Sequence, residues 1–185
     1  MEITNEILER VIAGKAAGEH KAYKNGSDNK IKGHIKATIH DLEQSKNIVI
    51  ETEDSYGSGY ASFVDVFCYK SNGRSSQVKS GTIYIDGIAV YLCKLAPVAV
   101  MGTMGKSRSS SGGSFGFLSA EDLNTFPPGD WLEIEAEIRK KLETHGFAIL
   151  DPRELKKPLP FIAEIETNLG DPPFKIFDAF FHWMD

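Results

Sequence analysis

Acidic and tyrosine side chains gather between positions 51 and 60 of this 185-residue chain. Glu51, Glu53 and Asp54 follow a short apolar run, and Tyr56 and Tyr60 come next, among glycine and serine residues. A loop of this composition is easily reshaped, and tyrosine anchors a partner with little loss of entropy. A plain hairpin connection is the competing interpretation. We predict that these five residues form part of a partner-binding surface.

The motifs that would indicate catalysis are missing from the sequence. No G-x-S-x-G stands at a strand–helix junction, and no cysteine stands at the start of a helix. Gly105-Lys106-Ser107 resembles the end of a phosphate-binding P-loop, but Val100 occupies the position of that motif's first glycine. We therefore expect no catalytic residue, no cofactor and no enzyme activity.

The spacing of the cysteine and histidine residues predicts no metal site. Cys68 and Cys93 stand 25 positions apart without a CxxC pattern, so we expect two buried thiols without a disulfide. His34 and His40 share the polar face of a strand expected over 30–40, where about 3.3 Å per residue separates them by roughly 20 Å. One ion could not bind both, and both are expected to be solvated.

Charge and composition exclude several further classes of protein. The net charge of −5 and the pI of about 5.6 do not favour nucleic acid as a partner. No apolar run approaches the roughly 18 residues that a membrane helix requires. The start of the chain carries Glu2, Glu6 and Glu9, unlike a signal peptide. We expect a single globular domain over residues 1–185, located in the cytoplasm.

The elements that must position these residues indicate an α+β fold. The pattern predicts a mostly antiparallel, twisted sheet, with an N-terminal helix over 3–13 and one long helix over about 130–145 packed on it. Asp130 is expected to cap the long helix, with Glu133 in the capping-box position and Gly146 at its end. A short helical turn is expected over 151–155.

The centre of the predicted sheet is the apolar stretch over 81–101. Asp86-Gly87 between alternating apolar residues predicts a tight hairpin there, whose return strand is apolar at both parities and therefore covered on both sides. Residues 174–185 fit either a helix or a strand, and their aromatic density and the two prolines favour the strand. Other strands are expected over 30–40, 47–53, 62–70, 98–101, 147–150 and 163–167, with a flexible loop over 102–116.

The last third of the chain carries a family resemblance. GFAILDPRELKKPLPFIAEIETN followed by PPFKIFDAFFHWMD resembles the tail of bacterial immunity proteins, which are encoded beside polymorphic toxins. The similarity covers about forty residues and rests on the PLPF phrase and the aromatic, acid-terminated end. It implies a single-domain, non-catalytic protein that binds and blocks one cognate toxin, and it assigns no functional residue.

Two other classes of function stay open at this point. A small-ligand-binding protein or an enzyme could use the glycine- and serine-rich stretch over 102–116 as a lid above a pocket at the sheet edge. A structural subunit would form obligate oligomers. The sequence identifies neither a toxin nor an oligomeric state.

Overall fold

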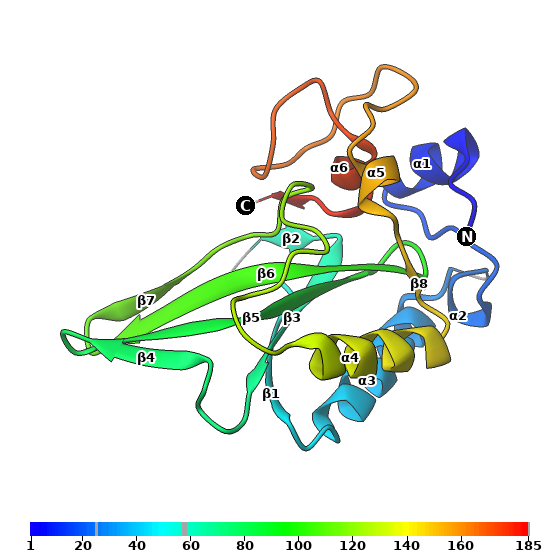
Figure 1. Ribbon diagram of the computed structural model, residues 1–185. Coiled ribbons are helices and arrows are strands. Elements are labelled where there is room, and N and C mark those ends of the chain that lie inside the picture. Colours follow the sequence, from blue (N-terminus) through cyan, green and yellow to red (C-terminus); the bar gives the residue numbers. More distant parts are fainter. Residues whose placement is uncertain (25, 57–58, 185) are drawn as a thin grey trace.

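A long antiparallel hairpin, β5 and β6, runs through the middle of the computed structural model, which describes residues 1–24, 26–56 and 59–184 (Figure 1). Their register runs from Ile83 opposite Arg108 to Leu92 opposite Ala99. Within the described residues, the main sheet has seven strands in the order β1-β3-β5-β6-β7, with β4 paired to β5 and β8 to β6. These strands are β1 (Ile48–Glu53), β3 (Phe63–Lys70), β4 (Ser76–Lys79), β5 (Thr82–Cys93), β6 (Val98–Ser109), β7 (Gly112–Phe115) and β8 (Ala148–Ile149).

All pairs in the main sheet are antiparallel except β6 with β8. A second, two-stranded sheet pairs β2 (Tyr60–Ala61) with β9 (Trp183–Met184). Within the described residues, the helices are α1 (Asn5–Ile12), α2 (Lys21–Lys24), α3 (Asp28–Glu43), α4 (Leu132–Thr144), α5 (Pro152–Leu155) and α6 (Ile176–Phe180). The prediction of an α+β fold with a mostly antiparallel sheet is confirmed.

Helices cover both faces of the sheet at its inner end. Helices α3 and α4 lie side by side on one face, and α1, α5 and α6 gather on the other (Figure 1). Alternate residues of β5 divide between the two layers: Tyr91 packs in the cluster with α1 and α6, whereas Val90 packs in the cluster with α3 and α4. The prediction that this strand is covered on both sides is confirmed.

The outer end of the sheet extends beyond both layers of helices (Figure 1). We call this end the distal arm; it consists of β4, β7, residues 82–86 of β5 and residues 105–109 of β6. Most of its residues are exposed, including Val78 at 71% and Phe115 at 52%. The arm is therefore held mainly by its own strand pairing.

The segment predicted as a strand over 30–40 is instead part of the 16-residue helix α3. Ile31, Gly33, Ile35, Ala37 and Ile39 alternate with polar residues, which suggested a strand. Ile31 and Ile35 also fit a helical stripe, and that stripe continues through two further buried residues, Thr38 and Leu42. Lysine and glycine are disfavoured in strands, so the helix period prevails.

The predicted hairpin at Asp86-Gly87 is wrong, because β5 continues through both residues. A Cβ atom on Gly87 would lie 2.6 Å from the carbonyl oxygen of Cys68 and 2.7 Å from the ring of Phe67. Glycine is needed here for a close approach of β3. The tight turn lies at Ser80-Gly81, where both residues have positive φ and join β4 to β5.

The predicted flexible loop over 102–116, and with it the lid, is also wrong. Residues 102–109 continue β6, and β7 follows after a short turn. Glycine and serine have little preference for strands, but pairing with β5 satisfies the backbone hydrogen bonds of this stretch. The stretch is one side of the distal arm.

Predictions for the remaining elements were right in part. The helix predicted over 130–145 is α4, which ends before Gly146 (φ 80°), but Asp130 does not cap it; buried Trp131 holds the N-cap position without a side-chain bond. The strand expected over 163–167 is not formed. The end of the chain contains the helix α6 and the short strand β9, so the preference for a strand was wrong for residues 176–180.

The thiols of Cys68 and Cys93 are buried and free, as predicted. Strands over 47–53, 62–70 and 147–150 are confirmed as β1, β3 and β8, the last shorter than expected. No helix in the described part of the chain is both long and apolar enough to span a membrane.

Candidate functional site

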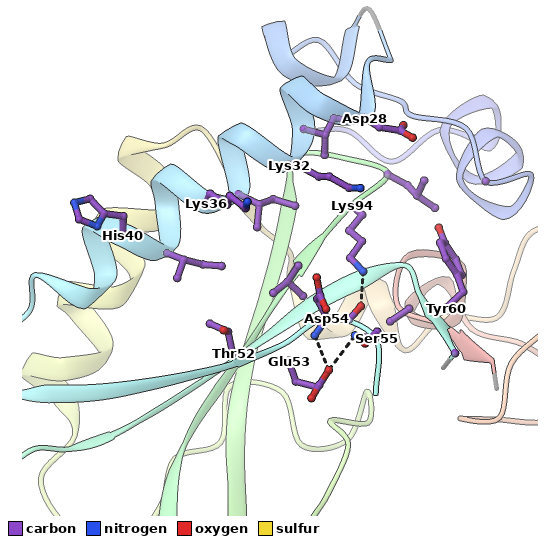
Figure 2. A pocket seen from close by; sticks show the side chains of 18 of the residues that line it. Asp28, Lys32, Lys36, His40, Thr52, Glu53, Asp54, Ser55, Tyr60 and Lys94 are labelled. Atoms are coloured by element: carbon purple, nitrogen blue, oxygen red, sulfur yellow. Dashed lines mark hydrogen bonds between the residues drawn. The ribbon is translucent and has the colours of Figure 1, made fainter. Parts of the chain in front are cut away.

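A groove of about 990 Å³ opens between α3 and the end of β1 with the loop that follows it (Figure 2). Its helical wall consists of residues that recur every three or four positions along the whole of α3, and a rise of about 1.5 Å per residue makes this wall roughly 22 Å long. These residues are Asp28, Ile31, Lys32, Ile35, Lys36, Ile39, His40 and Glu43. The groove is therefore long rather than round.

The opposite wall comes from the turn that follows β1. Thr52 and Glu53 belong to the strand, Asp54 and Ser55 to the turn, and Tyr60 to β2. Among the apolar residues at the base are Val64 and Leu95, which are almost completely buried. The groove thus has polar walls above an apolar base.

Glu53 shapes the turn at the rim. Its Oε1 accepts hydrogen bonds from the backbone N–H groups of Asp54, Ser55 and Tyr56, at 3.0, 3.0 and 2.9 Å. These bonds lower the pKa of Glu53, because they favour the ionised carboxylate. Three donors on one oxygen hold the turn in place, so Glu53 contributes to the form of the rim.

Lys94 reaches the groove from the segment after β5. Its Nζ donates to the backbone carbonyl of Asp54 at 2.6 Å, and Lys94 as a whole is partly buried. Burial lowers the pKa of Lys94, the carboxylate of Asp54 partly opposes this shift, and the ammonium of Lys32 adds to it. Figure 2 shows the side chains of Lys32 and Lys94 extending into the same end of the groove.

The structure places three of the five predicted contact residues at this groove. Glu53 and Asp54 lie on its wall, and the ring of Tyr60, with 43% of its surface exposed, lies at one end. Glu51 and Tyr56 do not line it. Gly57 and Ser58, between these positions, lie outside the described residues.

Glu51 and Tyr56 make contacts within the fold. Glu51 lies on the opposite face of the sheet, where it pairs with Arg108 and lies 3.9 Å from the ammonium of Lys106. The Tyr56 hydroxyl donates to Asp65 at 3.1 Å, and its ring packs against four aromatic side chains. Whether Glu51 also binds a partner stays a prediction.

Sequence reasoning did not find the lysines of the groove. Lys32 and Lys36 stand four positions apart, which places them on one side of a helix, but the alternating pattern of the segment predicts a strand. Lys94 had no local signal, because its approach to Asp54 depends on strand pairing between distant segments. Reading α3 with a helical period would have revealed the first two.

Two buried clusters elsewhere carry titratable groups. Asp65 is almost completely buried, and burial raises its pKa to about 6, against the opposing effects of Lys106 and the Tyr56 hydroxyl. Its Oδ1 has no hydrogen-bond partner within the described residues. Asp65 lines neither the groove along α3 nor the smaller pocket around Pro158 and Phe174.

Histidine rings meet at the junction of α3 and α4, contrary to the prediction that His34 is solvated. The ring centroid of His34 lies 4.3 Å from that of His20 and 6.4 Å from that of His145, and His34 stacks on Phe147. Burial, with the nearby histidines, lowers the pKa of His34 to about 4. Across the described ranges, no group of three or more histidine, cysteine, aspartate or glutamate residues is arranged to hold a metal ion.

Comparison of the chain with protein-family models, with curated proteins and with solved structures found no match. The groove is therefore interpreted from its own geometry.

Proposed function

We propose that this chain is a non-catalytic protein-binding module of the cytoplasm that neutralises a cognate bacterial toxin by occluding it. The observation that carries the proposal is the groove along α3, whose rim includes Glu53, Asp54 and Tyr60 from the predicted contact loop. A long, open groove with polar walls and an apolar base suits a segment of another protein. The partner is expected to be a protein rather than a nucleic acid.

The C-terminal segment supports this proposal through its position. The residues that resemble immunity proteins include α6 and β9, and β9 pairs with β2, so that Tyr60 lies opposite Met184. Phe177, Phe180 and Phe181 are buried in the core. The segment therefore positions the rim that bears Tyr60, and we expect the groove rather than the tail to contact the toxin.

The test is co-expression with the protein encoded immediately upstream, scored by growth and by capture of a stoichiometric complex. We expect the wild-type chain to suppress toxicity and to copurify with its neighbour. The double variant Asp54→Arg, Tyr60→Ala is expected to bind the upstream protein at least tenfold more weakly, a loss of about 1.4 kcal/mol. Glu133→Lys, on the exposed side of α4, serves as the charge-changing control and is expected to bind normally.

The proposal fails if no complex forms and growth is not restored by the wild-type chain. Equal binding by the rim variant and the wild-type chain would remove the groove from the interface while leaving the module proposal intact. Glu53 is kept unchanged in these variants, because its loss would disturb the turn itself.

A small-ligand-binding protein is the second candidate, and the partly buried Lys94 in a cavity of about 990 Å³ favours it. Ligand pockets commonly have volumes of about 300–1,000 Å³. A thermal-stability screen would detect such a ligand, because a ligand at about one hundred times its dissociation constant adds roughly 2.7 kcal/mol. A stabilising metabolite whose effect is lost in Lys94→Met would favour this function over the first.

A further inference from the structure

One end of the groove holds two lysines, Lys32 and Lys94, that form no ion pair within the described part of the chain. We propose that Lys32 and Lys94 form a subsite for a carboxylate, and that the groove binds an extended peptide segment of the partner through an aspartate or glutamate side chain placed there. This inference rests on the proposed function and names the chemistry of the contact.

The first support is the pairing of the cations. Among the described residues, no carboxylate oxygen lies within 4.0 Å of the ammonium groups of Lys32, Lys36 or Lys94, whereas six other lysines have such a partner. Within the described residues, the ammonium of Lys94 makes a single hydrogen bond, to the backbone carbonyl of Asp54. An ammonium carries three donors, so Lys94 retains donors for a ligand.

The second support is that most acids of the groove are already engaged. Glu53 accepts three backbone N–H groups, and Glu43 lies 3.6 Å from a ring nitrogen of His40. Asp28 stands in the first turn of α3, where the helix dipole stabilises its charge. Among the described residues, the carboxylate of Asp54 makes no ion pair within 4.0 Å; it favours the charged form of Lys94, but less strongly than burial opposes that form.

The third support is the geometry at this end of the groove. Figure 2 shows Lys32 on the helical wall, Lys94 below it and the Tyr60 hydroxyl beside them, which together border one space. The ammonium of Lys32 lowers the pKa of Lys94, so the two like charges repel each other, and a carboxylate bound near both would offset that repulsion. The Tyr60 hydroxyl can donate to the same anion.

The fourth support is the length of the groove. A wall of roughly 22 Å corresponds to about six or seven residues of an extended chain. The base of the groove along α3 offers apolar side chains, including Ile35 and Ile39, to the residues that flank the acid. The dimensions suit a peptide segment that lies along α3, with its acidic side chain at the Lys94 end.

The test uses blocked single residues, so that it needs no toxin. The ¹⁵N-labelled full chain is titrated with N-acetyl-glutamate N-methylamide and, separately, with the glutamine analogue. We expect localised amide shifts at Ser55, Tyr60 and Lys94 with the glutamate compound, with a dissociation constant near 10 mM, roughly −2.7 kcal/mol. The glutamine compound is expected to bind at least tenfold more weakly.

Lys94→Met and Lys32→Met are each expected to abolish the glutamate shifts, while Lys79→Met on the distal arm leaves them unchanged. Met keeps the length of the side chain, and the dispersion of the spectrum shows whether each variant is folded. The inference is overturned if the glutamate and glutamine compounds give the same shifts, if no localised shift occurs, or if both groove variants still bind.

The capture assay separates this inference from the proposed function. Capture of the toxin by Lys32→Met and Lys94→Met as tightly as by the wild-type chain would overturn the carboxylate subsite and leave the module proposal standing. Localised glutamate binding without any capture of the upstream protein would support the subsite and contradict the proposed function.

Discussion

The inner half of the β5–β6 hairpin and the distal arm belong to the same two strands, yet their surroundings differ. In β5, residues 88–93 are all buried, whereas Ile83 and Tyr84 at the other end are exposed by 40% and 48%. The hydrogen-bonding register is continuous along both halves. Strand pairing therefore extends farther than the core that stabilises it.

This difference indicates where stability resides. In the inner half, each side chain from Ile88 to Cys93 of β5 enters one of two apolar clusters, so burial contributes on both faces of the sheet. In the distal arm, cross-strand side-chain pairs and backbone hydrogen bonds contribute most of the stabilisation. The arm can thus vary in sequence or move its side chains at little cost to the fold.

The largest expected contrast comes from shortening one side chain in each half of β5. Leu92 and Tyr84 lie on the same face of the sheet, but Leu92 is fully buried. Leu92→Ala is expected to lower the free energy of unfolding by about 2–5 kcal/mol, whereas Tyr84→Ala is expected to cost less than about 1 kcal/mol. Urea denaturation measures both, and equal losses would contradict the division of the hairpin.

The second contrast concerns Asp65, the buried acid of β3, which lies opposite Tyr91 in the inner half of the hairpin. Because the pKa of Asp65 is raised from 3.8 to about 6, the folded protein keeps a proton that the unfolded chain releases between about pH 4 and 6. The contribution of Asp65 to stability is therefore present below pH 4 and is lost as the pH rises to about 6, by up to about 3 kcal/mol.

Asp65→Asn removes this loss. The stability of the variant relative to the wild-type chain is expected to increase between pH 4 and 6.5, by up to about 3 kcal/mol in urea denaturation. The lowered pKa of His34 acts in the opposite direction, since the unfolded chain takes up a proton there as the pH falls from 6.5 to about 4. A difference between variant and wild type that stays constant with pH would show that Asp65 is not perturbed.

The third contrast uses two glycines of the hairpin. A Cβ atom on Gly87 would collide with Cys68 and Phe67, whereas the nearest atoms to a Cβ on Gly105 lie 3.9 Å away. Gly87→Ala is expected to destabilise the protein by about 1–3 kcal/mol, since backbone atoms must shift. Gly105→Ala is expected to be neutral or to stabilise by up to about 1 kcal/mol. Thermal denaturation of the pair tests this, and a costly Gly105→Ala would contradict it.

Sequence reasoning succeeded where one pattern allowed one structure. The strand at 62–70 could be predicted because Phe63, Val64, Val66 and Phe67 exclude a polar face, and both faces are covered. Helix α3 could not be settled, because Ile31, Ile35 and Ile39 satisfy a period of two as well as a helical period. Only the layer that packs on the helix decides between the two.

The distal arm and the groove show a different limit. Gly105, Ser107 and Gly113 have no strand preference of their own, so their structure depends on β5, which begins more than twenty positions earlier. The rim residues Asp54 and Tyr60 were predicted from local composition. Lys94 could not be, because the contact with Asp54 joins residues 40 positions apart.

The smallest expected effect concerns the ion pair between Glu51 and Arg108, which joins β1 to the distal arm. Half of the Arg108 side chain is exposed, so solvent screens the attraction, and the pair is expected to contribute less than about 1 kcal/mol. A double-mutant cycle of Glu51→Gln and Arg108→Gln measures this coupling. A coupling above about 2 kcal/mol would mean that this ion pair to β1 stabilises the distal arm substantially. The stability of the arm would then not come mainly from its own strand pairing. A small coupling would leave Glu51 free to exchange its internal partner for a lysine or arginine of a bound protein, which is the role that its place in the predicted contact surface requires.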